Sequence, residues 1–227
     1  MTTELQTNLK QVLNDLTGTK AQLVAVSKYH PAEAIMEAYG AGQRIFGESH
    51  VQELETKHPA LPADIEWHFI GHLQTNKVKY IAPYISLIHS VDSMKLLREI
   101  DKQAGKAGRV IDCLLQIHVA QEETKYGFLP AELLDVLQEG EYRKLEHVRL
   151  RGLMCMATNT DDEAQIRREF RLAHDTFEEV RKRFFPDDES FSELSMGMSD
   201  DYRIALEEGS TMVRVGSKIF GLRNYNA

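Results

Sequence analysis

Short apolar runs alternate with amphipathic stretches along most of the chain. Apolar residues recur at helical spacing from Leu5 to Leu16 and Gly18 follows them, so the pattern predicts a helix that precedes the main fold. Eight later runs have the length and apolar character of strands: 23–27, 44–47, 67–70, 87–91, 110–119, 148–154, 193–196 and 212–215. Helices are expected after most of these strands, at 31–40, 49–57, 76–81, 93–104, 130–137, 162–184 and 200–208.

This alternation predicts an α/β fold, a single (β/α)8 barrel of the TIM type with an extra N-terminal helix that covers one end of the core. An open, doubly wound parallel sheet is the alternative. The 227 residues spread over eight units give about 28 residues each, close to the roughly 30 that a βαβ unit needs. No composition shift and no Pro- or Gly-rich linker interrupts the sequence, so we expect residues 1–227 to form one domain.

Composition and charge exclude several classes of protein. Hydrophobic residues make up 42% of the chain and charged residues 27%, which is typical of a globular protein and not of a disordered one. The 35 acidic and 27 basic side chains give a formal net charge of −8, which would repel a nucleic-acid backbone. No run approaches the roughly 18 apolar residues of a membrane span, and the N-terminus does not resemble a signal peptide. We expect a cytoplasmic protein without nucleic-acid or membrane partners.

Cysteine and histidine positions do not indicate a metal site. Cys113 and Cys155 lie in apolar runs, where a buried thiol is expected, and two cysteines alone make neither a zinc site nor a disulfide framework. His68 and His72 flank a strand end, and no acidic or cysteine partner completes a ligand set. The chain also lacks the glycine-rich and nucleophile-elbow motifs of NTPases, dinucleotide-binding proteins and hydrolases.

Lys28 directly follows the first predicted strand. Active sites of these barrels lie at the carboxyl ends of the strands. A lysine at the end of an apolar strand is partly desolvated, which lowers the pKa of its amine and frees it to attack a carbonyl carbon. The position therefore indicates Schiff-base chemistry, with an ordinary surface lysine as the alternative.

Small residues in the last two strand-to-helix loops indicate a phosphate site. Ser199 follows the seventh predicted strand, and Gly216 and Ser217 follow the eighth. Loops after strands seven and eight often bind phosphate in these barrels. As an alternative, Ser199 is only a helix N-cap. Asp200 and Asp201 should face solvent, because they would repel a phosphate.

Arg214 lies between two valines of the eighth strand, so alternation places it on the opposite side from them. If that side is the barrel interior, the buried cation needs an anionic or acceptor partner. A structural salt bridge is the alternative. The methionines of 154–156 and 196–198 are expected in the core and in pocket walls.

At these residues the sequence resembles the pyridoxal-phosphate homeostasis protein family. The shared motifs run in order over nearly the whole chain, at 24–28, 46–53 (FGESHVQE), 67–77 (WHFIGHLQTNK), 88–92, 151–154, 194–201 and 209–221. The resemblance implies a barrel of the alanine-racemase N-terminal type, with pyridoxal 5′-phosphate (PLP) held as a Schiff base on Lys28. It also implies phosphate contacts at Ser199, Gly216 and Ser217, and places Arg214 beside the cofactor.

One position departs from the family pattern. Ser49, followed by His50, stands where the family reads Asn after Gly-Glu. The resemblance places this position near the cofactor ring, so the shorter Ser49 puts one ring hydrogen bond in question, with His50 or water as replacements.

The function implied by the resemblance is the storage, buffering or delivery of PLP, with apo PLP enzymes as candidate acceptors. Catalysis with PLP also needs a base on each reacting face and exclusion of water. Because eight units and one helix use the whole length, we predict no robust catalytic activity, and we expect a monomer. A racemase-like enzyme with Tyr29, His72 or His118 as base is one alternative, and a cofactor-free Schiff-base aldolase is the other.

Overall fold

The strands close into a parallel barrel. The computed structural model describes residues 2–122 and 124–221, and within them eight strands pair in chain order, with the last returning to the first. The strands are β1 (Gln22–Val26), β2 (Ile45–Glu48), β3 (Glu66–Phe69), β4 (Leu87–Val91), β5 (Ile111–Gln116), β6 (Val148–Met154), β7 (Glu193–Ser195) and β8 (Met212–Val215). The predicted (β/α)8 barrel is confirmed, and the open-sheet alternative is wrong.

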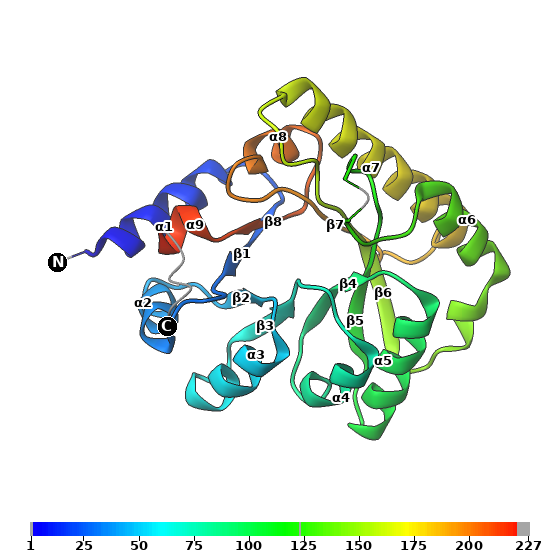
Figure 1. The fold of residues 1–227 in the computed structure, drawn as a ribbon, viewed down its shortest axis with the longest axis horizontal. Helices are drawn as coiled ribbons and strands as arrows, with labels where there is room; N and C mark the ends of the chain where they lie inside the picture. Colours follow the sequence, from blue (N-terminus) through cyan, green and yellow to red (C-terminus); the bar gives the residue numbers. More distant parts are fainter. Residues whose placement is uncertain (1, 123, 222–227) are drawn as a thin grey trace.

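Helices surround the strands in Figure 1, one after each strand. In chain order they are α2 (Ala32–Gly40), α3 (Val51–Lys57), α4 (Val78–Ile81), α5 (Met94–Lys106), α6 (Pro130–Glu139), α7 (Glu163–Phe184), α8 (Tyr202–Glu207) and α9 (Ser217–Phe220). Three 3₁₀ turns accompany them, at His58–Ala60, Thr75–Lys77 and Glu141–Lys144. The predicted helix 76–81 covers most of the turn at Thr75–Lys77 and all of α4. α9 and the other two turns were not predicted, because elements of three or four residues are too short to show a periodic pattern.

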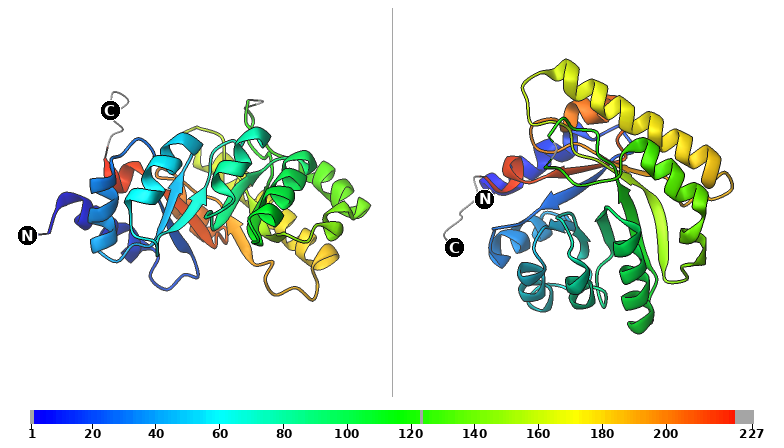
Figure 2. Two further views of the ribbon diagram at one scale, coloured as in Figure 1. Left: turned by 90° about the horizontal axis from the view of Figure 1, so that it is seen from below. Right: turned by 45° about the vertical axis from the view of Figure 1, so that its right-hand side comes forward.

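The predicted N-terminal helix is α1 (Glu4–Asp15), which packs beside α9 and α2 (Figures 1 and 2). Thr3 begins it with a capping box shared with Gln6. Leu9 and Val12 are buried against the core. Asp15, its last residue, accepts hydrogen bonds from Tyr202 and from an arginine of α8. The helix therefore joins the first and last units of the barrel.

The strands present one face to the helices and the other to the barrel interior. Large outer residues such as Trp67 and Phe69 belong to the main core between strands and helices. A separate interior cluster consists of Val24, Leu87, Leu114, Met154 and Met212. A Cβ on Gly47 would lie 2.9 Å from Cγ1 of Val24, so the interior has no space for a side chain there.

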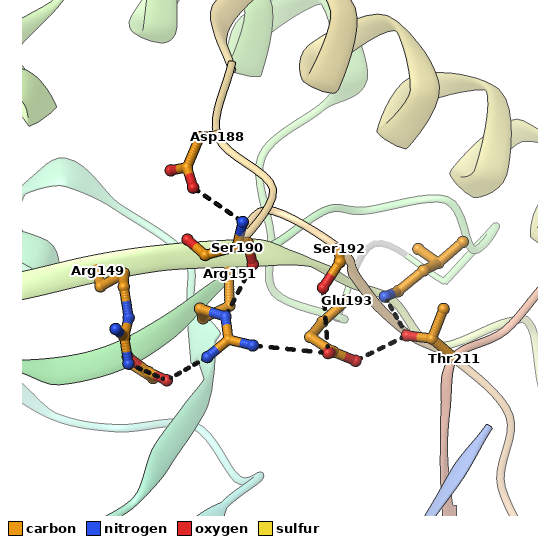
Figure 3. Close-up of polar contacts among 9 residues, drawn as sticks. Arg149, Arg151, Asp188, Ser190, Ser192, Glu193 and Thr211 are labelled. Carbon is orange, nitrogen blue, oxygen red and sulfur yellow. Dashed lines mark hydrogen bonds and ion pairs between the residues drawn. The ribbon is translucent and has the colours of Figure 1, made fainter. Parts of the chain in front are cut away.

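Charged residues join β5 to β8 toward the amino-terminal end of the barrel (Figure 3). Asp112 accepts hydrogen bonds from Arg149 at 2.7 Å and from Arg151 at 2.8 Å. Arg151 also lies 3.8 Å from Glu193, which accepts a hydrogen bond of 2.9 Å from Thr211. Pairs as exposed as that of Arg149 are worth only about 0–1 kcal/mol each. Their role is to align neighbouring strands.

The two cysteines are buried free thiols, as predicted. Burial raises the pKa of Cys155 to about 12 and raises the pKa of Cys113 as well. Both thiols therefore stay protonated and unreactive near neutral pH.

None of the helices in the described part of the chain has the length and apolar character needed to cross a membrane.

Candidate functional site

All six predicted site residues line one cavity of about 190 Å³ at the carboxyl ends of the strands. Methionines and aliphatic residues supply its apolar walls, which agrees with the predicted place of Met156 and Met198. The lining consists of Lys28, Ser49, Ser199, Arg214, Gly216 and Ser217 together with Val26, Ile70, Met156, Met198 and Asp200. The closure of the barrel is what brings β1 and β2 beside the loops after β7 and β8.

The backbone on both sides of Lys28 is held by α3. The carbonyl of Ser27 accepts a hydrogen bond of 2.9 Å from Lys57 Nζ, and the N–H of Tyr29 donates one of 2.6 Å to Glu53 Oε1. Tyr29 has a φ of 64°, in the left-handed region that residues other than glycine rarely adopt. The chain thus turns immediately after Lys28, and α3 fixes the turn.

A buried ion cluster supports that turn. Lys57 Nζ lies 2.8 Å from Glu48 Oε1 and 2.6 Å from Glu53 Oε1, while the Ser27 hydroxyl donates a 2.6 Å hydrogen bond to Glu48. Burial raises the pKa of Glu48 to about 7, and the Lys57 cation opposes that rise. Sequence reasoning missed this cluster, although Glu53 and Lys57 stand at the i, i+4 spacing of paired helix residues.

Two loops meet at the opposite wall of the cavity. The Ser199 hydroxyl accepts a hydrogen bond of 3.2 Å from the N–H of Gly216. Ser199 is not the N-cap of α8, because that position belongs to Asp201. A Cβ on Gly216 would lie 3.1 Å from the carbonyl oxygen of Val26, so glycine permits the close approach of β8 to β1. The hydroxyls of Ser199 and Ser217 are therefore presented from one wall.

The prediction that Asp200 and Asp201 face solvent is right for Asp200 and wrong for Asp201. Asp200 is exposed, but Asp201 is buried, with a relative exposure of 8%. Oδ1 of Asp201 accepts a hydrogen bond of 2.6 Å from the N–H of Met198, and burial raises the pKa of this carboxyl. Asp201 fails to face solvent because it satisfies a backbone donor of the β7–α8 loop.

Arg214 points into the barrel and is 4% exposed. Its guanidinium donates to the Ser195 hydroxyl at 2.6 Å and to the carbonyl of Cys155 at 2.9 Å. The salt-bridge alternative is wrong, because no described residue forms an ion pair with Arg214. Burial lowers the pKa of Arg214, yet a guanidinium remains charged near neutral pH. A buried cation with neutral partners favours an anionic or acceptor ligand.

The three candidate bases lie outside the described lining of this cavity. The Tyr29 hydroxyl is 3.4 Å from Nε2 of His50, and Nδ1 of His72 is 3.1 Å from Asp92. Nδ1 of His118 lies 2.6 Å from the backbone carbonyl oxygen of Lys125 in the same loop. The structure therefore does not place a predicted base in the wall that Lys28 shares.

A second cavity, of about 510 Å³, adjoins the first and shares Met198 and Asp200 with it. Residues after β5, β6 and β7 line it, including Lys125, Thr158, Asp161 and Glu163.

In the described residues, no cluster of three histidine, cysteine or acidic side chains could hold a metal ion.

The fold and site define a closed parallel (β/α)8 barrel with a lysine after β1 and serine-bearing loops after β7 and β8. The family model of the alanine racemase N-terminal domain matches residues 2–224. The pyridoxal phosphate homeostasis protein of Aquifex aeolicus is 41% identical over 207 residues, which are 90% of this chain and 88% of that protein. The chain belongs to the pyridoxal phosphate homeostasis protein family.

Solved structures agree with this assignment. PipY of Synechococcus elongatus PCC7942 without PLP is 39% identical, with a TM-score of 0.89 over 96% of this chain and 100% of that one. The structure of PipY with PLP bound is 38% identical, with a TM-score of 0.85 and the same coverage. The expected resemblance of family and fold is confirmed.

Proposed function

We propose that this protein binds PLP in the cavity lined by Lys28 and serves as a cytoplasmic store, buffer or delivery protein for the cofactor. The observation that carries the proposal is that all six residues predicted from the sequence and from the family resemblance, at or after β1, β2, β7 and β8, line one cavity. The family assignment and the PLP-bound structure of the PipY relative support it. We propose that residues 1–227 act as one monomeric PLP-binding unit.

The residues present fit the cofactor. PLP supplies an aldehyde, which condenses with a primary amine to a Schiff base. Nζ of Lys28 would attack the aldehyde carbon, and loss of one water would leave a carbon–nitrogen double bond to Lys28. Ser199 and Ser217 would donate hydrogen bonds to the phosphate, beside the backbone of Gly216. Arg214 would supply the positive charge that the described residues leave without a carboxylate partner.

Ser49 would line the cofactor site without a long side chain. It is partly buried in the cavity wall, and Gly71 packs tightly on it: a Cβ on Gly71 would lie 2.4 Å from the Ser49 carbonyl oxygen. The close approach leaves no space for a side chain at position 71, and the Ser49 hydroxyl reaches less far than an asparagine amide because its side chain is shorter. His50 is exposed and lies against Tyr29, with ring centroids 5.1 Å apart.

A carrier is favoured over a racemase-like enzyme because Tyr29, His72 and His118 lie outside the described cavity lining. Catalysis on both faces of a substrate needs bases within hydrogen-bond reach of the reacting carbon. The adjoining 510 Å³ cavity shares Met198 and Asp200 with the Lys28 cavity, and amines would approach Lys28 from that side. Apo PLP enzymes are the acceptors that this chemistry would serve, since each presents a lysine amine of its own.

The purified protein mixed with PLP should acquire a visible absorption band, and an apo PLP enzyme should remove it while gaining activity. Single amino acids should show net conversion near background. No new band with PLP would refute cofactor binding and favour the aldolase alternative. A band accompanied by racemisation at about 1 per second or faster would favour the racemase-like enzyme instead.

A further inference from the structure

A continuous chain of hydrogen bonds crosses the interior of the barrel from β3 to β8. Nδ1 of His68 lies 3.0 Å from Nε2 of His89, and Nδ1 of His89 lies 2.9 Å from the Ser195 hydroxyl oxygen. Arg214 donates to the same hydroxyl at 2.6 Å. All four side chains are buried, with relative exposures between 0 and 4%. The Lys28 cavity is thus linked to the middle of the barrel by polar groups.

His68 forms the far end of the chain. It borders a pocket of about 230 Å³ toward the amino-terminal end, which is also lined by Asp112, Arg151 and Glu193. The chain therefore connects this pocket with the cavity that contains Arg214, at the other end of the barrel.

The donors of this chain can be assigned from its chemistry. A guanidinium has no acceptor, so the Ser195 oxygen must receive the hydrogen of Arg214. The Ser195 hydroxyl hydrogen then has one described acceptor, Nδ1 of His89. A neutral His89 with a free Nδ1 carries its proton on Nε2 and donates it to Nδ1 of His68. Each hydrogen therefore points away from Arg214, toward the amino-terminal pocket.

The surroundings keep both imidazoles neutral. Burial lowers the pKa of His68 to about 3, although the nearby Asp112 carboxylate opposes this effect. Burial lowers the pKa of His89 well below its usual value, and the neighbouring His68 and the Arg214 cation lower it further. No carboxylate contacts either ring among the hydrogen bonds of the described residues.

We propose that His89, held by His68, is a positioning residue that fixes the guanidinium of Arg214 through Ser195. This inference rests on the proposed binding of PLP. It assigns a role to two buried histidines that belong to no metal-binding cluster of the described residues and lie outside the Lys28 cavity lining. A guanidinium held by Ser195 keeps one orientation toward a ligand in the cavity, and it donates hydrogen bonds without losing its proton.

The tautomers can be tested in the wild-type protein without ligand, by NMR of ¹⁵N-labelled histidine rings. We expect His68 and His89 to be neutral, protonated on Nε2, and unchanged between pH 5.5 and 8.5. A proton on Nδ1 of His89, or titration of either ring in this range, would overturn the proposal. This measurement does not depend on whether PLP binds.

The link to the cavity can be tested with Ser195→Ala, which breaks the contacts to His89 and Arg214 together. We expect PLP to bind about ten-fold more weakly, as for loss of one hydrogen bond to a charged group, and the visible band of the complex to change its pH dependence. Ser195→Thr keeps the hydroxyl and should restore both the affinity for PLP and the pH dependence of the band. Ser90→Ala is the matched control, because the buried Ser90 hydroxyl has no hydrogen-bond partner in the described residues.

The outcomes separate the two proposals. If Ser195→Ala binds PLP with unchanged affinity and an unchanged pH profile, the positioning role is wrong while PLP binding stands. If the wild-type protein does not bind PLP at Lys28, the proposed function itself is wrong, whatever the tautomers are.

Discussion

Lys57 Nζ donates a hydrogen bond of 2.9 Å to the backbone carbonyl of Ser27. Ser27 is the residue before Lys28, so the end of α3 controls the backbone from which Lys28 extends. Glu53 acts on the other side through the N–H of Tyr29. The two α3 residues also contact each other at 2.6 Å, so they form one clamp on the peptide groups around Lys28.

Lys57→Met should destabilise the protein and slow its reaction with PLP. Above pH 7, where Glu48 is ionised, the substitution leaves its buried carboxylate without a cation, and breaking a buried ion pair costs roughly 3–5 kcal/mol. Urea unfolding measures the stability, and the rise of the visible band measures the rate of attachment to Lys28. Thr56→Ala, on the exposed side of α3, should change neither the free energy of unfolding nor the rate of attachment. A Lys57→Met protein with normal attachment rate would show that the clamp does not position Lys28.

Lys28→Ala should abolish the visible band while the fold is kept, because a partly buried side chain after a strand contributes little to the core. In the wild-type protein, borohydride reduction followed by peptide mapping should place the cofactor on Lys28. Lys218→Ala is a suitable control, since this lysine lies over the Tyr202 ring, 5.1 Å from its centroid, and outside the cavity lining. Label found mainly on Lys218 would contradict the assignment.

The double substitution Ser199→Ala with Ser217→Ala should weaken PLP much more than unphosphorylated pyridoxal. Each hydroxyl would donate a hydrogen bond to a charged phosphate, worth about 1.5–3 kcal/mol. Binding titrations of both ligands to both proteins give the comparison. Equal losses for the two ligands would mean that the phosphate is bound elsewhere.

The sequence predicts the barrel and the members of the Lys28 cavity because both follow from rules that are local in the chain. Strand ends are visible as apolar runs, and barrel topology places every strand end on one face. The sequence predicts neither the burial of Asp201 nor the contacts of Glu53 and Lys57 around Lys28, because these depend on side-chain contacts between distant parts of the chain. Whether a carboxylate faces solvent or accepts a backbone N–H depends on loop geometry, and no pattern of residue types shows that Lys57 reaches Ser27 across 30 residues.

The histidine chain was also not predicted as a chain. His68, His89, Ser195 and Arg214 each lie on the inner side of a different strand, so their contacts depend on barrel closure and on the stagger of the strands. The sequence shows that inner positions are polar, but not which of them meet.

Stability should fall as the pH decreases below about 6.5, because of His68 and His89. Both rings titrate near 6.5 in an unfolded chain, whereas burial keeps them neutral in the native protein until the pH is far lower. Below 6.5 the unfolded chain therefore binds up to two more protons than the native protein. These two groups alone would lower the free energy of unfolding by about 2.7 kcal/mol per pH unit.

Between pH 4.5 and 7, the titration of Glu48 has the opposite effect on the free energy of unfolding. Its pKa is raised to about 7 by burial, so here the native protein binds a proton that the unfolded chain does not. Together the three groups should give a net loss of about 1.4 kcal/mol per pH unit as the pH falls from 6.5 to 4.5. Glu48→Gln removes the opposing group, so its stability should fall about twice as steeply over this range. Urea unfolding at pH 5 and pH 6 measures both slopes, with Glu189→Gln as an exposed control. Parallel slopes for Glu48→Gln and the wild-type protein would show that Glu48 is ionised in the native state throughout this range.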